Sequence, residues 1–231
     1  MTIMQGRSTV RQSPLQPGDP APDFVLPAVD RDGTVSLADY RGKTPVLLAP
    51  MRGLYCAFCR RYIAQMGFTR QKLRALGVEV LAIVATTPER ARLYYRFRPA
   101  GVPLAADPDL TTLRAFGVPH RALTPEVSQI FASRLSDLAH ELKIPATDIN
   151  EIQSALCRRD GYEPTQTDEE DLQRHGGQFV GQFLVDRGGI VRWINIEGAA
   201  EGEAGVGKFP SDDELLAAAR ASLGLGPSER S

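Results

Sequence analysis

The chain has 231 residues, of which 42% are hydrophobic and 24% charged, and its formal net charge is −1. That balance is typical of a soluble globule, built as one sizeable domain or as one domain with an insertion. A net charge so close to zero predicts no strong attraction to nucleic acid or to a membrane surface. No apolar run is long enough to cross a bilayer, and three cysteines are too few for a secreted scaffold built on disulfides.

The first segment, residues 1–17, is polar and aperiodic, so we expect a flexible tail before a single domain over residues 18–231. It lacks the apolar core of a signal peptide. We therefore expect a cytoplasmic protein, in which a pair of cysteines would be kept reduced and available for catalysis.

Short strands are expected before the centre of the chain. Residues 24–26 and 34–37 are predicted to pair as a small hairpin around the turn at residues 30–33. The apolar run at residues 46–49 lies between two prolines, and its length and these breakers predict a buried strand.

A cysteine pair follows that strand. Two residues separate Cys56 from Cys59, and from there apolar residues recur at helical steps, at Tyr62, Ile63, Met66 and Leu73. A strand therefore leads into a helix, and the pair lies where the helix begins.

The position of the pair predicts a reactive thiol. The first turn of a helix offers unpaired N–H groups and the positive end of the helix dipole, which stabilise a thiolate at Cys56. Arg52, Arg60 and Arg61 can add positive charge. Cys59 lies one turn on, with Cβ atoms about 5–6 Å apart, so a disulfide can form. We expect Cys56 to attack and Cys59 to displace whatever Cys56 has bound.

Two other interpretations of the pair are weaker. A CxxC pair is half of a zinc site, but the remaining candidate ligands are not paired at ligand spacing: Cys157, His120, His140 and His175. Both cysteines could also be small buried hydrophobic residues. A CxxC at a strand-to-helix junction in a βα pattern favours redox chemistry, so we expect no metal.

Strands and helices alternate after the pair. Residues 78–84 form a nearly continuous aliphatic run, which is typical of a central parallel strand. Next come a helix over 87–97, a strand at 102–105 and a helix that ends near Phe116.

Residues 120–176 differ because they carry helical periodicity without a strand. We expect a helical insertion of two or three helical segments, at 125–142, at 148–158 and in a short acidic piece from Asp168. Cys157, in the second of these, is expected to pack between helices; a role as a third redox partner is the weaker alternative.

The chain then returns to strands. We predict strands at 178–185 and 190–196, a mobile segment rich in glycine and glutamate at 197–208, and a last helix at 215–223 that opens with a capping box at Ser211 and Glu214.

Several segments resemble those of a known family. The main ones are APDFVL (21–26), LADYRG (37–42), RGLYCAFCR (52–60), LAADPD (104–109) and FLVDRGGI (183–190). They resemble segments of peroxiredoxin-like (AhpC/TSA family) proteins of the thioredoxin-like superfamily. The likeness covers about residues 18–116 and 177–231, but not the helical insertion.

The resemblance implies an α/β, thioredoxin-like fold of three layers, with a central mixed sheet, an N-terminal β-hairpin and a helical insertion at 120–176. It implies an antioxidant enzyme in which Cys56 reduces a peroxide and becomes a sulfenic acid. Cys59 would condense with it to a disulfide, which an external thiol reductant such as a thioredoxin would reduce. No cofactor, nucleic acid or membrane is expected to take part, and a homodimer is left open.

Two alternatives stay open. In the first, the protein is a thiol-disulfide oxidoreductase without significant peroxidase activity, and Cys56 attacks a disulfide substrate. In the second, it is a redox-sensing or metal-binding module without enzymatic activity, whose insertion docks a partner.

Three positions depart from the family pattern. Ala49 and Gly53 stand where peroxiredoxins carry a Pro and a Thr or Ser before the cysteine, and Val180 stands where they carry an Arg. The usual hydroxyl and cation that polarise the peroxide are therefore missing. Arg52, on the loop that leads to Cys56, is the candidate to supply the charge.

Overall fold

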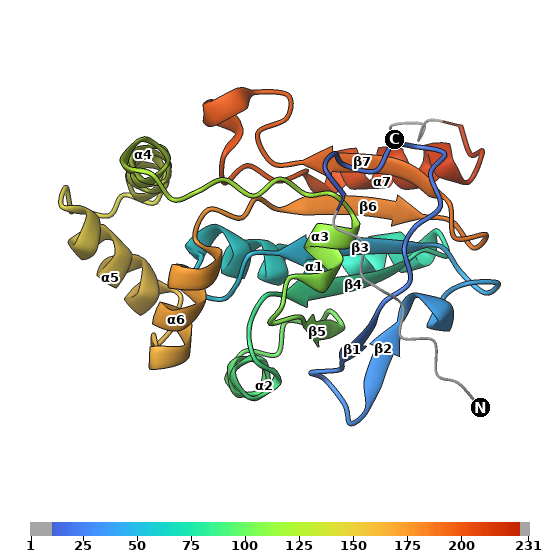
Figure 1. The fold of residues 1–231 in the computed structure, drawn as a ribbon, viewed down its shortest axis with the longest axis horizontal. Helices are drawn as coiled ribbons and strands as arrows, with labels where there is room; N and C mark the ends of the chain where they lie inside the picture. The colour runs from blue at the N-terminus through green and yellow to red at the C-terminus, as the bar shows by residue number, and fades with distance from the viewer. Residues whose placement is uncertain (1–10, 227–231) are drawn as a thin grey trace.

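The computed structural model describes residues 11–226, and its centre is a five-stranded sheet (Figure 1). The strands are β3 (Val46–Met51), β4 (Glu79–Val84), β5 (Leu104–Ala106), β6 (Gly181–Val185) and β7 (Val191–Ile196). Their order is β5-β4-β3-β6-β7, which places β3 in the middle. β3, β4 and β5 run parallel, whereas β6 is antiparallel to both β3 and β7, so the predicted mixed sheet is confirmed.

The predicted N-terminal hairpin is also confirmed. β1 (Val25–Pro27) pairs antiparallel with β2 (Thr34–Ser36) in a small sheet of its own.

The central strand is longer than predicted, because it continues through Pro50 to Met51. Proline cannot donate to a strand ladder and is tolerated only where no partner needs its N–H. Pairing with β6 stops at Leu48, opposite Phe183, so beyond that point β3 pairs with β4 alone. The prediction that Pro50 ends the strand was therefore wrong.

Helices and the N-terminal segment cover the two faces of the sheet. The helices outside the insertion are α1 (Ala57–Ala75), α2 (Pro88–Phe97), α3 (Thr111–Ala115) and α7 (Asp212–Ser222). One core joins Leu47 and Val80 of the sheet to α1 and α7, and the other joins Leu48 and Leu81 to α3 and to residues that precede β3. The sheet and the segments that cover its two faces form the three predicted layers (Figure 1).

Of the tail predicted over residues 1–17, the first ten residues lie outside the described part, and residues 11–17 are exposed except near Leu15. Leu15 is fully buried, and its N–H donates to the carbonyl of Phe116. Gly117 permits the close approach, because a Cβ there would lie 2.0 Å from the carbonyl oxygen of Ser13. Leu15 is therefore anchored to the domain within the segment predicted to be a flexible tail.

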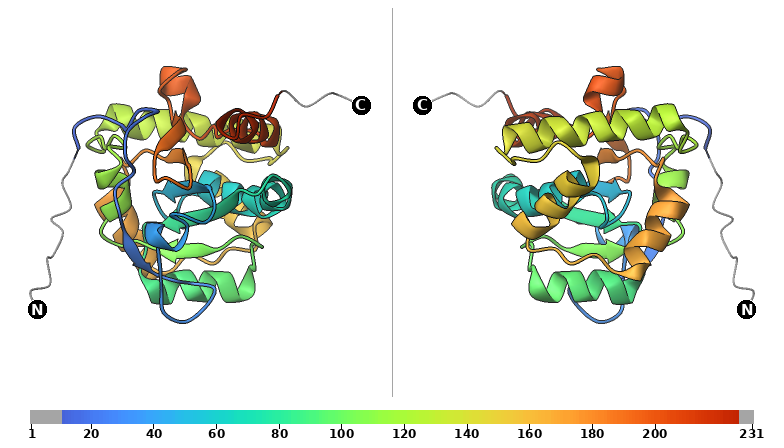
Figure 2. Two further views of the ribbon diagram at one scale, coloured as in Figure 1. Left: turned by 90° about the vertical axis from the view of Figure 1, so that its right-hand side faces the viewer. Right: turned by 90° about the vertical axis from the view of Figure 1, so that its left-hand side faces the viewer.

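The insertion forms three helices: α4 (Pro125–Glu141), α5 (Ile149–Arg159) and α6 (Gln166–His175). They gather at one end of the sheet in Figure 1 and face the viewer in the right panel of Figure 2. Ala57, in the first turn of α1, shares a buried cluster with Leu138 of α4 and Ile152 and Leu156 of α5. The insertion therefore packs directly on the turn that carries the cysteines.

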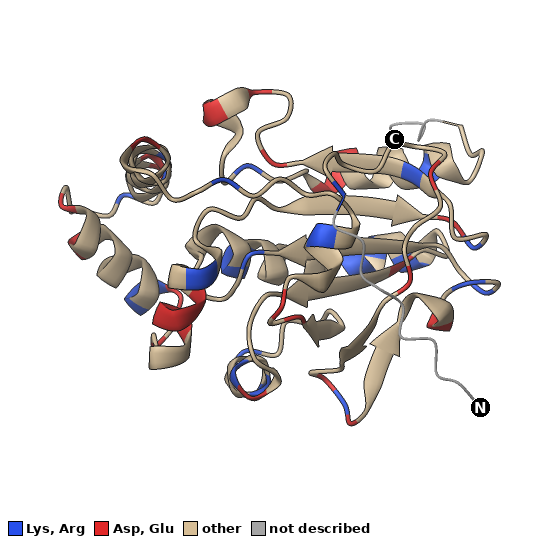
Figure 3. Ribbon diagram, in the orientation of Figure 1, with Lys and Arg blue, Asp and Glu red and all other residues tan. Residues whose placement is uncertain are grey.

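Basic and acidic residues are interspersed along the fold (Figure 3). Over residues 11–226, no helix combines the length and the apolar character that a bilayer span requires.

Candidate active site

Cys56 lies where β3 has ended and α1 begins. It is the N-cap residue of α1, with an extended backbone, and its Sγ accepts a hydrogen bond of 3.2 Å from the N–H of Cys59. This is the bond that an N-cap side chain makes with the third helical N–H. Cys56 is 8% exposed and Cys59 only 1%. The structure thus brings the two predicted cysteines together, with Cys56 the more accessible.

The two thiols differ in acidity. Burial, the largest influence, raises the pKa of Cys56, but the side chain of Cys59, the cation of Arg52 and the N–H of Cys59 together bring that pKa down to about 7. Burial raises the pKa of Cys59 far above its ordinary value, and the neighbouring Cys56 adds to this effect. Near neutral pH Cys56 is therefore ionised to a large extent, whereas Cys59 stays a thiol.

Arg52 is buried near the pair, with 2% exposure. Its guanidinium forms an ion pair with Glu197, and the ring of Phe131 lies 4.8 Å from its Cζ. Burial by itself disfavours the charge, but Glu197 and both cysteines raise the pKa of Arg52 well above its usual value. Arg52 therefore stays cationic beside Cys56.

Glu197 is a site residue that the sequence analysis missed. Its carboxylate also accepts hydrogen bonds from the N–H groups of Val180, at 2.9 Å, and Gly207, at 2.7 Å. It opens the segment predicted to be mobile over residues 197–208, yet it is buried. That prediction was wrong for Glu197, because three donors hold its carboxylate in place. The only signal in the sequence was its position directly after a strand.

The structure explains why no hydroxyl stands at Gly53. The backbone there has φ +145°, which favours glycine, and a Cβ would lie 2.7 Å from the ring of Tyr55. Val180, where the family carries an Arg, has no charge to offer, but its N–H helps to fix Glu197. Arg52 is thus the cation that the structure places beside Cys56.

A pocket of about 300 Å³ opens at Cys56. Cys56 and Arg52 line it, and its walls come largely from the insertion, through Leu123, Ser128, Phe131, Ala132, Leu135, Ile149, Gln153 and Leu172. The reactive thiol is therefore reached through a mostly apolar space beneath α4, α5 and α6.

The model of the AhpC/TSA family matches residues 17–194, well over half of the chain. The chain belongs to the AhpC/TSA family.

Relatives of this AhpC/TSA protein share only part of its length. Two proteins from strains of Mycobacterium tuberculosis, provisionally named as peroxiredoxins, are 34% identical to it over 104 residues. That match covers 45% of this chain and 64% of each relative, which is less than two thirds of their length.

Solved structures show the same fold. The reduced 2-Cys peroxiredoxin of Plasmodium vivax superposes with a TM-score of 0.56 at 16% identity, over 90% of this chain and 96% of that one. The peroxidoxin BcpB of Mycobacterium tuberculosis has a TM-score of 0.55 at 16% identity, over 90% of this chain and 97% of that one. A protein of Chlorobium tepidum provisionally identified as the thiol:disulfide interchange protein DsbE has a TM-score of 0.51 at 23% identity, over 89% of this chain and 99% of that one. At these identities the likeness shows the fold alone, and it confirms the thioredoxin-like fold.

Arg60, which was predicted to add positive charge near Cys56, makes its contacts with other groups of this AhpC/TSA protein. Its guanidinium donates to the carbonyl of Leu54 at 2.9 Å and to Asp160 at 3.1 Å, and stacks 4.0 Å from the ring of Tyr162. Arg61 is partly exposed and lies 3.7 Å from the same Asp160 carboxylate. These two arginines tie the cysteine turn to the insertion, whereas Arg52 acts on the thiols.

Cys157 packs between helices, as predicted. It is buried, and burial raises its pKa, although Nη2 of Arg60 lies 3.8 Å from its Sγ. Within residues 11–226, no three His, Cys, Asp or Glu side chains are grouped closely enough to hold a metal ion.

Proposed function

We propose that this AhpC/TSA protein is a thiol-dependent peroxidase in which Cys56 attacks the peroxide and Cys59 resolves the product. One observation carries the proposal: the Cys56 thiol, with its pKa lowered to about 7, lies at a helix N-terminus, beside a buried cation and in a pocket. Thiolate is the reactive form of cysteine, and a fixed cation can stabilise charge that develops on a leaving oxygen.

The chemistry follows from these neighbours. The Cys56 thiolate attacks one peroxide oxygen, the O–O bond breaks, and Cys56 becomes a sulfenic acid while the leaving oxygen takes up a proton. Arg52 would stabilise the negative charge on that oxygen. The Cys59 thiol then attacks the Cys56 sulfur, which releases water and forms a disulfide. An external dithiol, such as a thioredoxin, would restore both thiols.

The second candidate is a thiol-disulfide oxidoreductase. A CxxC at a helix N-terminus, with an acidic first thiol and a buried second one, suits disulfide exchange as well. The 8% exposure of Cys56 favours peroxide, because a disulfide on a folded protein would need more room at the sulfur. In either reaction the pair must be kept reduced, for which the cytoplasm is the suitable compartment.

Stopped-flow oxidation of the fully reduced protein tests the proposal. We expect hydrogen peroxide or cumene hydroperoxide to oxidise Cys56 rapidly, and peptide mass mapping to find a disulfide between Cys56 and Cys59. A disulfide that contains Cys157 would count heavily against the assigned roles. If neither peroxide reacts but insulin disulfides are reduced, the oxidoreductase is the better description.

A further inference from the structure

We propose that a second pocket of this protein binds the phosphate group of a small organic phosphate. The proposal goes beyond the thiol chemistry and does not depend on it, because it concerns charged groups that the reaction does not use. Three arginines and one carboxylate meet at this pocket, which we call the arginine pocket; its lining includes Arg60, Arg61, Ala64, Tyr94, Arg98 and Asp160.

The arginine pocket forms where three helices come together. Arg60 and Arg61 lie on α1, Arg98 is the C-cap residue of α2, and Asp160 is the C-cap residue of α5. The space between them measures about 370 Å³. Within residues 11–226, Asp160 is the one carboxylate paired with these arginines, at 3.1 Å from Arg60 and 3.7 Å from Arg61. The pocket therefore has a formal excess of two positive charges.

Two of the three guanidinium groups keep donors for a ligand. Arg98 uses its Nε, which donates to the carbonyl of Asp160 at 3.2 Å. Arg61 is partly exposed, and its distance of 3.7 Å from the Asp160 carboxylate is too long for a hydrogen bond. In the part of the chain that the structure describes, the terminal nitrogens of Arg61 and Arg98 have no hydrogen-bond acceptor.

The third guanidinium contributes mainly charge. Arg60 is buried, and its terminal nitrogens already donate to the carbonyl of Leu54 and to Asp160. Its Nε is buried without a partner among the described residues. A buried cation that has no mobile counter-ion of its own raises the positive potential of the cleft beside it.

Arg98 is also held in place by aromatic rings. Its Cζ lies 5.8 Å from the ring of Tyr94 and 5.8 Å from the ring of Tyr162. A guanidinium within about 6 Å of a ring is attracted to it. The donors of Arg98 are therefore positioned before any ligand arrives.

Phosphate matches this arrangement better than carboxylate does. Guanidinium groups form paired, charge-assisted hydrogen bonds with phosphate oxygens. A phosphate monoester carries about −1.5 to −2 charges near pH 7, which is close to the excess of two positive charges in the pocket. A tetrahedral group can also accept from α1 and from the end of α2 at once. The volume is within the usual range of ligand pockets, so an organic group has room beside Ala64 and Tyr94.

The arginine pocket adjoins the cysteine site without being part of it. Arg60 lines both pockets, and it also donates to the carbonyl of Tyr55, directly before Cys56. A bound phosphate would reduce the repulsion between the three arginines and join α1, α2 and the inserted α5. The ligand should therefore stabilise the folded protein at the junction that carries the cysteine turn.

Isothermal titration calorimetry of the full-length reduced protein tests the proposal, with phenyl phosphate and benzoate as probes at constant ionic strength. The two probes share a phenyl group and differ in the anion. We expect phenyl phosphate to bind with a Kd of about 1 mM or tighter and to raise the melting temperature. Benzoate should bind at least about tenfold more weakly, because it offers fewer charges and acceptors.

Two variants remove the donors one at a time. Arg61→Gln and Arg98→Gln should each weaken the binding of phenyl phosphate by about tenfold or more, the scale of a hydrogen bond between charged groups. The matched control is Arg96→Gln, because Arg96 is exposed on α2 and lies outside the pocket. It should bind phenyl phosphate as the wild type does.

A third variant should change the affinity in the opposite direction. Asp160→Asn removes the negative charge that competes with the ligand, so it should bind phenyl phosphate about fivefold more tightly or better. Arginines that serve only to hold the helices together would give no such gain.

The proposal is overturned if phenyl phosphate does not bind, if benzoate binds as tightly, or if Arg61→Gln and Arg98→Gln both bind like the wild type. Calorimetry does not involve peroxide, so its result is independent of whether Cys56 is a peroxidase. If neither peroxide oxidises Cys56 while phenyl phosphate binds as expected, the proposed function fails and the phosphate site stands.

Discussion

Cys59 acts on Cys56 through two donors, its side chain and its backbone N–H. A substitution can remove the side-chain donor and keep the backbone N–H. Cys59→Ser retains a side-chain donor, whereas Cys59→Ala removes it. We expect the pKa of Cys56 to stay near 7 in Cys59→Ser and to rise toward about 8.5, the value of a free cysteine, in Cys59→Ala.

The pH dependence of Cys56 alkylation by iodoacetamide, followed on its own peptide, measures this pKa. Because the thiolate is the reacting form, the rate rises with pH through the pKa, and a higher midpoint means a weaker acid. Identical midpoints in the two variants would show that the side-chain donor has no effect.

Arg52 is tied to a partner far along the chain, which changes how its role can be tested. The sequence alone suggests that Arg52→Met should leave the fold intact. The structure shows instead that this change would leave the buried carboxylate of Glu197 without its cation. Breaking one side of a buried ion pair costs about 3–5 kcal/mol. We therefore expect Arg52→Met to unfold at clearly lower denaturant concentration than the wild type.

The double variant Arg52→Met/Glu197→Gln separates stability from chemistry. It should recover most of the lost stability, because no buried charge is left unpaired. Oxidation by peroxide should still be slower than in the wild type by about ten- to a thousand-fold, the scale for losing one preorganised donor. Urea unfolding and stopped-flow oxidation measure the two effects. If the double variant is oxidised as fast as the wild type, Arg52 has no role in the transition state.

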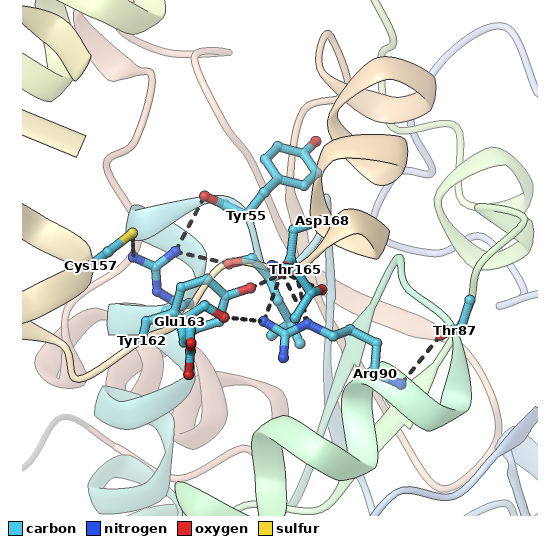
Figure 4. A network of polar contacts seen from close by, with 10 residues as sticks. Tyr55, Thr87, Arg90, Cys157, Tyr162, Glu163, Thr165 and Asp168 are labelled. Carbon is cyan, nitrogen blue, oxygen red and sulfur yellow. Dashed lines mark hydrogen bonds and ion pairs between the residues drawn. The ribbon is translucent and has the colours of Figure 1, made fainter. Parts of the chain in front are cut away.

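Helix α6 is held against α2 by a buried ion pair (Figure 4). Nη2 of Arg90 lies 2.7 Å from Asp168, and the same carboxylate accepts from the hydroxyl of Tyr162 at 2.5 Å. At the far end of α6, the hydroxyl of Tyr55 donates to the carbonyl of His175 at 2.9 Å. These contacts connect the insertion to the loop that carries the cysteines.

Asp168→Asn tests whether this anchor positions the insertion. The buried Arg90 would lose its charged partner, at a cost of about 3–5 kcal/mol, so the melting temperature should fall. As α6 loosens, Cys56 should be alkylated faster at fixed pH. The matched control is Asp137→Asn, since Asp137 pairs with Arg134 on an exposed face of α4 and such pairs contribute about 0–1 kcal/mol. If both variants alkylate at the wild-type rate, the anchor is not needed at the site.

For the molecule as a whole, the acidity of Cys56 links stability to pH. Its folded pKa of about 7 lies below the unfolded value of about 8.5. The stabilisation is therefore fully present above the unfolded pKa and is lost as pH falls through about 7. Cys59, with its raised pKa, acts in the opposite direction, but only once the unfolded thiol ionises near pH 8.5.

We expect the reduced wild type to gain about 1.5 kcal/mol of unfolding free energy over Cys56→Ser between pH 6 and pH 8.5. Urea denaturation under a reductant, at several pH values, measures the difference. A difference that is constant or that shrinks over this range would contradict the low pKa of Cys56.

Local patterns determined much of the fold and the nucleophile. The CxxC, the alternation of strands and helices, the hairpins and the three inserted helices all follow from periodicity and capping within short segments. The placement of Cys56 at the start of α1 needs only the strand before it and the helix after it, because the N–H groups that stabilise its thiolate belong to the same turn.

The surroundings of that nucleophile were decided only by the tertiary structure. Arg52 and Glu197 are 145 residues apart, and nothing local to either predicts an ion pair that forms only where both are buried. The packing of Ser13 and Pro14 against Gly117, the continuation of β3 through Pro50 and the apolar pocket beneath α4, α5 and α6 likewise depend on which segments meet in space. The sequence by itself determines the reactive thiol, because its acidity comes largely from neighbours in one helical turn. The tertiary structure decides the cation and the pocket, because both depend on contacts between distant segments that exclude water.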